Sequence, residues 1–473
     1  MFDSPPHDTI AAVSTPAGAG GIAVVRVSGE GAVGVIDGCF RSGARSPAAH
    51  SDEPPRRPVA RRATYGTWFA AGGGDAIDDV LVTYFPGPRS YTGEDVVEVS
   101  CHGSIYIQAA VLDSCLASGA RLAQPGEFTR RAYLNGRLDL TQAEGVGDLI
   151  AAETAAAHRL ARTQLGGGIS RAMLALRGEL IEFAALLELE NDFGEEDVEF
   201  ADRRGLSARV TALLAETERL LRSFEVGQAV LQGVATVIAG RPNAGKSTLL
   251  NALLGDDRAI VSPVAGTTRD TIEAQLSIEG VAFRLVDTAG IREAADEIEA
   301  LGVARTMAAV ERAAVLLYVW DVASTAPEEV VADLERLRRP GLEVVAVANK
   351  MDLNPYARLE HYPGADLGPE RFVPVSAMND MNLGLLRERL FAAGVGELPA
   401  PGDAVLTRAR HVAALREASA ALGRVGEGLS AGLGGDLLVL DLRHALHHVG
   451  EVTGEIGVDD VLDAIFAGFC IGK

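Results

Sequence analysis

The stretch Gly240-Arg241-Pro242-Asn243-Ala244-Gly245-Lys246-Ser247 decides the fold of the central part of this chain. The apolar run 234–239 precedes it and the run 248–253 follows it, which is the pattern of a buried strand, a glycine-rich loop and a helix. In that setting, loop N–H groups and the helix N-terminus bind phosphate. We therefore predict a nucleotide-binding α/β domain, with Lys246 on the β- and γ-phosphates and Ser247 on Mg²⁺.

Four further motifs follow in the order that a guanine-nucleotide site requires. They are Gly266-Thr267-Thr268-Arg269-Asp270, Asp287-Thr288-Ala289-Gly290, Asn349-Lys350-Met351-Asp352 and Ser376-Ala377. The Asp352 carboxylate can accept hydrogen bonds from the ring N–H and the amino group of guanine together, a pair that adenine does not offer. This order resembles the Ras-like GTPase superfamily, which implies a mainly parallel sheet and GTP.

The residues expected to bind GTP come from these motifs. They are Asn243, Ala244, Gly245, Lys246, Ser247, Thr248, Asp287, Thr288, Ala289, Gly290, Asn349, Lys350, Asp352, Ser376 and Ala377. The runs 275–278 and 282–286 flank Glu279-Gly280, which predicts a hairpin and one antiparallel strand.

The residue after Gly290 is Ile291, where many small GTPases carry a glutamine that orients water. Some other group must then position the attacking water. The charge that develops on the phosphates must also be neutralised, a role in which an arginine finger contributes roughly 10³–10⁵ in rate in other GTPases. Asn243 is a candidate ligand for a monovalent cation beside the phosphates. Four acidic residues are open candidates for orienting water: Glu293, Asp296, Glu297 and Glu299.

Composition narrows the class of protein. The 473 residues are 48% hydrophobic and carry a net charge of −22, so the chain is globular and its bulk repels nucleic acid. A nucleic-acid substrate would need a local basic patch or a more basic partner. The four cysteines are scattered, and neither a signal peptide nor a membrane span is evident. We expect a cytoplasmic protein.

Composition and the spacing of apolar residues divide the chain into four segments. Strands are predicted near 9–13, 21–27, 80–85 and 95–99, a helix near 104–118, and a surface loop over 41–63. Helical spacing fills 148–164 and 171–190, broken by glycines at 166–168 and followed by an acidic turn at 191–197. We predict an α+β domain over 1–122, a helical domain in two parts over 123–228 and 399–473, and a G domain inserted over 229–398.

Motifs outside the G domain narrow the resemblance. Asp8-Thr9-Ile10-Ala11-Ala12, Tyr91-Thr92-Gly93-Glu94-Asp95, Pro125-Gly126-Glu127-Phe128-Thr129, the segment 137–144 and the terminal Cys470-Ile471-Gly472-Lys473 are similar to the MnmE (TrmE) family of tRNA-modification GTPases. The resemblance covers essentially the whole chain. It implies a homodimer whose N-terminal domain binds a tetrahydrofolate derivative (5-formyl- or methylene-tetrahydrofolate). It also implies a heterotetramer with the flavoprotein MnmG (GidA) that modifies C5 of the tRNA wobble uridine.

The resemblance also assigns roles by position. Asn243 would hold potassium, with Ser262, Val264 and Thr267 completing its shell, and Thr268 would join Ser247 on Mg²⁺. Glu299 would orient the attacking water. Arg26, Glu98, Arg137 and Lys473 would bind folate, with arginine at 137 where the family pattern has lysine. Cys470 would be a reactive thiol near the folate.

Two other functions remain open from the sequence. One is a GTP-controlled assembly factor that binds ribosomal RNA, although such factors usually carry a basic or glycine-rich RNA-binding domain. The other is a folate-dependent transferase with a regulatory G domain. His102 and the cluster His444, His447 and His448 are better explained as hydrogen-bonded or surface side chains than as catalytic or metal-binding groups.

Overall fold

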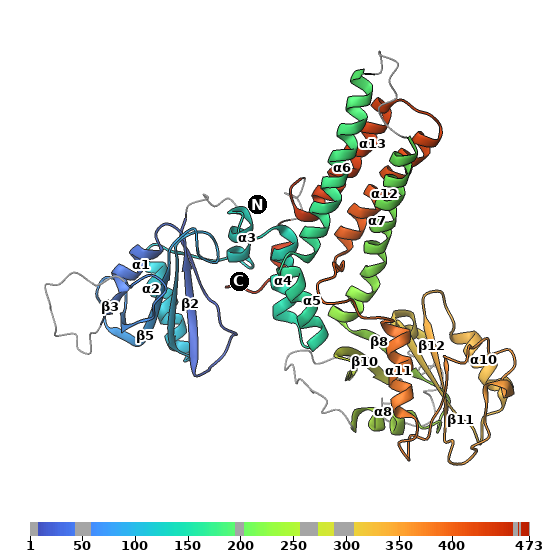
Figure 1. Cartoon of the computed structure of the whole chain (residues 1–473). Helices are drawn as coiled ribbons and strands as arrows, with labels where there is room; N and C mark the ends of the chain where they lie inside the picture. The colour runs from blue at the N-terminus through green and yellow to red at the C-terminus, as the bar shows by residue number, and fades with distance from the viewer. Residues whose placement is uncertain are drawn as a thin grey trace. The chain divides into compact units, whose positions relative to one another are not determined.

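The computed structural model describes residues 8–42, 58–193, 203–255, 273–287, 307–456, 462 and 465–472 (Figure 1). The chain forms two compact units. The first contains Met1–Gly147, Leu165–Leu189 and Leu442–Lys473, and the second contains Asp148–Gln164 and Glu190–Asp441.

The first unit is built on a seven-stranded sheet in the order β3-β4-β5-β6-β2-β1-β7. Its neighbouring strands are antiparallel, except for the parallel pair β1–β7. The strands are β1 (Ile10–Val13), β2 (Ile22–Ser28), β3 (Phe40–Ser42), β4 (Thr64–Phe69), β5 (Ala76–Phe85), β6 (Val96–His102) and β7 (Arg121–Leu122).

Two helices cover one face of this sheet, α1 (Ala32–Cys39) and α2 (Ile105–Ala117) (Figure 1). Val25 and Val27 of β2 point into that core, so Arg26 between them points to the opposite face. There, Phe128 of α3 (Glu127–Leu134) packs with Ile10 and Ala12. The alternation of β2 therefore separates the apolar core from a polar face.

The prediction of a surface loop over 41–63 is wrong for its first two residues. Arg41 and Ser42 lie in β3 and pair with Thr67 and Gly66 of β4, because the buried Phe40 fixes the strand against Trp68. Residues 43–57 lie outside the described part of the chain.

The helices on either side of the G domain, within 140–232 and 409–453, follow the predicted spacing with two differences. They are α4 (Leu140–Ala151), α5 (Ala155–Leu165), α6 (Gly168–Phe193), α7 (Arg203–Gln232), α12 (Ala409–Ser430) and α13 (Gly435–Thr453). The stretch 148–164 is divided between α4 and α5, because the Thr154 hydroxyl accepts a hydrogen bond from Ala157 N at 3.2 Å and starts a new helix. The prediction of an acidic turn over 191–197 is wrong at 191–193, because α6 continues to Phe193.

The second unit contains a six-stranded sheet in the order β13-β12-β11-β8-β10-β9. Every neighbouring pair is parallel except β9–β10, as the hairpin signal predicts. The strands are β8 (Val234–Ala239), β9 (Glu273–Ile278), β10 (Val281–Asp287), β11 (Val315–Asp321), β12 (Glu343–Asn349) and β13 (Phe372–Pro374).

Helices pack on both faces of this sheet. α8 (Lys246–Gly255) and α11 (Leu383–Gly394) share one apolar core with the strands, and α10 (Pro327–Leu337) shares the other (Figure 1). A short 3₁₀ helix, η2 (Leu359–His361), precedes β13. The fold class is as predicted: an α+β N-terminal part, long helices and a Ras-like α/β domain. None of the described helices is long and apolar enough to cross a membrane.

Candidate functional site

The phosphate loop lies between β8 and α8, as the sequence predicts. Lys246 is buried, and its Nζ donates to the carbonyl oxygens of Gly240 and Arg241, both at 2.8 Å. These bonds hold the ammonium group across the loop. Ser247 and Thr248, in the first turn of α8, are exposed and accessible to a ligand. The loop therefore presents a cation, two hydroxyls and a helix N-terminus together.

Asn243 has a left-handed backbone, with φ of 61°. Asparagine tolerates this region better than most residues. Its side chain is exposed. An exposed amide oxygen at the edge of a phosphate loop is a suitable ligand for a monovalent cation.

Asn349 links the phosphate loop to the base-recognition motifs. It is 2% exposed, donates from Nδ2 to Ala244 O at 2.9 Å and accepts at Oδ1 from Ala377 N at 3.1 Å. These two bonds join segments more than a hundred residues apart in sequence. A buried amide with both ends satisfied fixes the relative placement of the loop and the Ser376-Ala377 turn.

Asp352, the predicted guanine selector, is also held in place. Ser376 Oγ donates to its Oδ1 at 2.6 Å. Lys350, with φ of 64°, pairs with Asp321 Oδ2 at 2.8 Å, and this contact helps to lower the pKa of Asp321 against the effect of its burial. Asp287 ends β10, where it pairs in parallel register with Ile238 of β8. The motifs therefore meet at the carboxyl edge of the sheet.

A contact of the phosphate loop was not predicted. Arg241 forms ion pairs with Glu329 at 2.5 Å and Asp333 at 2.8 Å, both on α10, and Tyr318 donates to Asp333 at 2.7 Å. The hydrogen bonds that Arg241 donates to Asp333 raise the pKa of Arg241. No local pattern could reveal it, because the partners lie 88 and 92 residues away.

Several predicted site residues lie outside the described part of the chain. They are Ser262, Val264, Thr267, Thr268, Thr288, Ala289, Gly290, Glu299 and Lys473, and the alternatives Glu293, Asp296 and Glu297.

The second predicted site lies on the open face of the first unit's sheet. Arg26 and Glu98 are cross-strand partners and form an ion pair through Arg26 Nη2 at 2.8 Å and Nε at 3.0 Å. The guanidinium carbon lies 5.1 Å from the Tyr91 ring centroid and 5.7 Å from that of Phe128. The structure therefore combines a carboxylate, a cation and two aromatic rings, which suits a flat heterocycle.

The segment 470–472 docks against residues that follow β1 and β7 of the same sheet. Ile471 forms an antiparallel bridge with Pro125, and Ser14 Oγ donates to Gly472 O at 3.0 Å. Cys470 is exposed. Arg137 is exposed as well, beside Gly93.

An ionic network that the sequence did not reveal supports this region. Asp8 and Glu127 are bridged by Arg121 and Arg131, with contacts of 2.5–3.0 Å, and Arg131 also reaches Glu94 at 3.2 Å. Burial alone would raise the pKa of Asp8 and of Glu127, but the arginine hydrogen bonds lower both. The carboxylates stay charged inside the domain because each is paired.

The histidines behave as surface or hydrogen-bonded groups. His102 Nδ1 lies 2.7 Å from Asp78 Oδ1, and His447 and His448 both contact Glu451 on α13.

Burial and the nearby Asp78 raise the pKa of Cys101 to about 11, so this thiol stays protonated at neutral pH. Among the described residues, no group of three or more His, Cys, Asp and Glu side chains could hold a metal ion.

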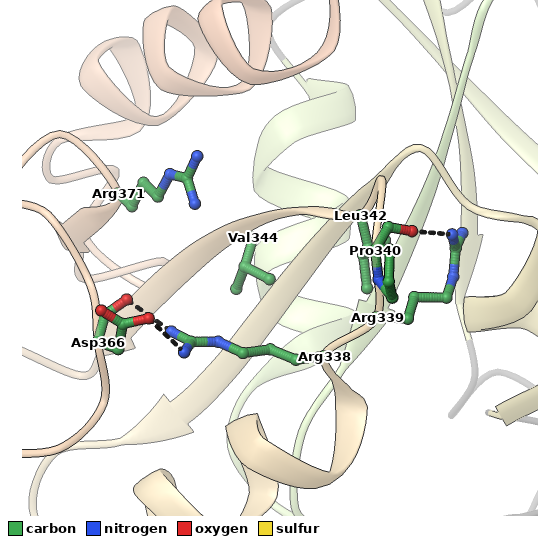
Figure 2. A pocket seen from close by; sticks show the side chains of 7 residues that line it. All are labelled: Arg338, Arg339, Pro340, Leu342, Val344, Asp366 and Arg371. Carbon is green, nitrogen blue, oxygen red and sulfur yellow. Dashed lines mark hydrogen bonds and ion pairs between the residues drawn. The ribbon is translucent and has the colours of Figure 1, made fainter.

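A cavity of about 390 Å³ lies where β12 begins, at the opposite edge of the sheet from the nucleotide motifs (Figure 2). Three arginines line it, but each is engaged: Arg338 with Asp366, Arg371 with Glu343, and Arg339 with carbonyl oxygens that include Pro340. All three guanidinium groups therefore already have protein acceptors, and two of them are paired with carboxylates.

The chain resembles known proteins over nearly its whole length. Residues 9–137 match the N-terminus of the GTP-binding protein TrmE, and residues 140–470 match the MnmE helical domain. The proteins named tRNA modification GTPase MnmE from Cytophaga hutchinsonii, Christiangramia forsetii and Salinibacter ruber are 44%, 43% and 46% identical to it. These alignments cover 98–99% of this chain and 98–99% of each relative.

Proposed function

Because the chain belongs to the MnmE family of tRNA modification GTPases, we propose that it hydrolyses GTP in a potassium-dependent way during modification of the tRNA wobble uridine. GTPase activity follows from the family and from the assembled motifs. Potassium, folate and the flavoprotein MnmG are the proposed part.

The observation that carries the potassium proposal is the conformation of Asn243. Its left-handed backbone and exposed side chain leave its amide oxygen available at the rim of the phosphate loop. A bound cation there would supply the charge that an arginine finger supplies elsewhere. Ser262, Val264 and Thr267 would complete its shell, Ser247 and Thr268 would hold Mg²⁺, and Glu299 would orient the attacking water.

The open face of the first unit supports the folate proposal. Glu98 would hydrogen-bond the pterin, while Arg26, Arg137 and Lys473 would hold the glutamate tail. Arg26 would have to exchange part of its contact with Glu98 for the ligand. The docked segment 470–472 would bring Cys470 close to the carbon donor, a 5-formyl- or methylene-tetrahydrofolate.

We further propose a cytoplasmic homodimer that joins MnmG in a heterotetramer and reaches tRNA through that complex. The proposed domains are 1–122, 123–228 with 399–473, and 229–398.

The test is GTP turnover by the full chain in potassium and in sodium at equal ionic strength. We expect turnover at least tenfold faster in potassium, because one favourable charge contact at the transition state is worth roughly 2.7–4 kcal/mol. Equal rates in the two salts would overturn the proposed potassium dependence and the role of Asn243 in it.

Two variants at one position separate backbone from side chain. Asn243→Gly keeps the left-handed backbone without strain, whereas Asn243→Ala adds strain. Both should lose the potassium effect while retaining GDP binding. Retention of the effect in Asn243→Gly would show that the amide does not bind the cation.

A further inference from the structure

A second cavity lies within the second unit, between α5, the end of α7 and residues 398–405. Its volume is about 470 Å³, within the range of ligand sites. Leu160, Val230 and Val405 form part of its lining and belong to the apolar core that extends into the G domain.

The rim of this cavity is cationic. His158, Arg159 and Arg162 line it and are exposed, and their spacing of three and four residues places them on one face of α5. Asp403 also lines the cavity, but its Oδ2 already accepts from Ala400 N at 2.9 Å. The local balance of charge is therefore positive in a chain with a net charge of −22.

Within the described residues, neither Arg159 nor Arg162 forms an ion pair or a side-chain hydrogen bond. This differs from the cavity in Figure 2, where Arg338 and Arg371 are paired with carboxylates. Two guanidinium groups that face solvent without a protein partner, above an apolar floor, form a site for an anion with a less polar body. Arginine is well suited to phosphate, because its fork of N–H groups matches two phosphate oxygens.

We infer that this rim binds the phosphate backbone of the tRNA, with one nucleotide seated in the cavity. The inference rests on the proposed function in one respect, that tRNA is the substrate. Most of an acidic chain repels a polyanion, so direct contact requires a cationic patch of this kind. The chain would then touch tRNA itself in addition to any contact through a partner.

The position of α5 gives such a contact a consequence. Ala156 N donates to Gly280 O at 3.1 Å, at the turn of the β9–β10 hairpin. β10 continues to Asp287, the first residue of a nucleotide motif. A tRNA bound to α5 would therefore contact the helix that packs directly against the β9–β10 hairpin, and β10 leads into the proposed GTP site.

The experiment measures binding of fluorescently labelled, unmodified tRNA to the full chain over a series of potassium chloride concentrations. We expect Arg159→Gln/Arg162→Gln to weaken binding roughly tenfold or more and to reduce the slope of log K against log salt by about 2. The matched control is Arg312→Gln/Arg416→Gln, because both arginines are exposed, lie in the second unit and form no ion pair within the described residues.

Three outcomes would overturn the inference: no tRNA binding by the unaltered chain, no change in Arg159→Gln/Arg162→Gln, or an equal loss in the control pair. Displacement of tRNA by inorganic phosphate beyond the effect of ionic strength would instead assign the rim to a small anion and would also overturn it. Potassium-stimulated GTP turnover is measured on the same preparations and should be unchanged in both pairs. Loss of potassium stimulation in the unaltered chain would show failure of the proposed function, and it would be seen independently of tRNA binding.

Discussion

The hydroxyl of Ser376 donates to the carboxylate of Asp352, which we predict to select guanine. We expect Ser376→Ala to raise the dissociation constant for GDP about fivefold, because a net hydrogen bond contributes roughly 1 kcal/mol. Preference for guanine over xanthine nucleotides should remain, since Asp352 is intact, whereas Asp352→Asn should reverse it. Fluorescent-nucleotide titrations measure both. Ser430→Ala, on the exposed end of α12, is the control. Equal affinities for GDP in the unaltered chain, Ser376→Ala and Ser430→Ala would contradict the role of Ser376.

The carboxylates of Asp8 and Glu127 make the first unit sensitive to acid. Their pKa values are lowered in the folded chain, so their contribution to stability is present above the ordinary values of 3.8 and 4.5 and is lost as pH falls through the lower, folded values. We expect hydrogen exchange in α3, corrected for its intrinsic pH dependence, to accelerate below pH 4.5.

The variant Glu127→Gln isolates this effect. It should accelerate exchange in α3 already at neutral pH, because Arg121 and Arg131 lose a charged partner, and it should show a smaller further change in acid. An unchanged acid response in Glu127→Gln would show that other carboxyl groups are responsible.

At the scale of elements, the turn between β9 and β10 contacts α5. Gly280 has φ of 78°, and a Cβ there would lie 3.4 Å from Ala156 N and 3.5 Å from Ala155 Cβ. Gly280→Ala should therefore destabilise the second unit by about 1–2 kcal/mol through the left-handed backbone alone, because both contacts are at ordinary van der Waals distance and α5 need not move. Gly341→Ala is the control, since its φ is 77° and nothing lies within 4 Å. Chemical denaturation compares them: we expect equal losses of stability, and a clearly larger loss in Gly280→Ala would show that the added methyl group displaces α5.

The elements also show what sequence reasoning can reach. The β9–β10 hairpin and the phosphate loop are local patterns, and both were predicted. The division between α4 and α5 depends on one threonine hydroxyl, and β3 depends on where Phe40 packs. The contacts of Arg241 with α10 and those of Asp8 with Arg121 and Arg131 join residues 88 to 123 positions apart, which only the folded chain brings together.

At the scale of the whole molecule, the two ends of the described chain meet. Gly472 has φ of 98°, and a Cβ there would overlap Val13 O. We expect Gly472→Ala to release segment 470–472, to accelerate its hydrogen exchange and to weaken folate binding at least tenfold, while GTP turnover stays unchanged. Gly119→Ala, with φ of 101° and open space around it, controls for strain. Unchanged exchange in Gly472→Ala would contradict the docking.

The meeting of Ser14 with Gly472 has a consequence for biosynthesis. Ser14 is synthesised 458 residues before its hydrogen-bond partner, so part of the surface of β1 stays uncovered while the G domain is translated. The G domain, whose strands lie between residues 234 and 374, can complete its own sheet earlier. Nascent chains of increasing length should therefore acquire nucleotide binding before the first unit becomes resistant to protease.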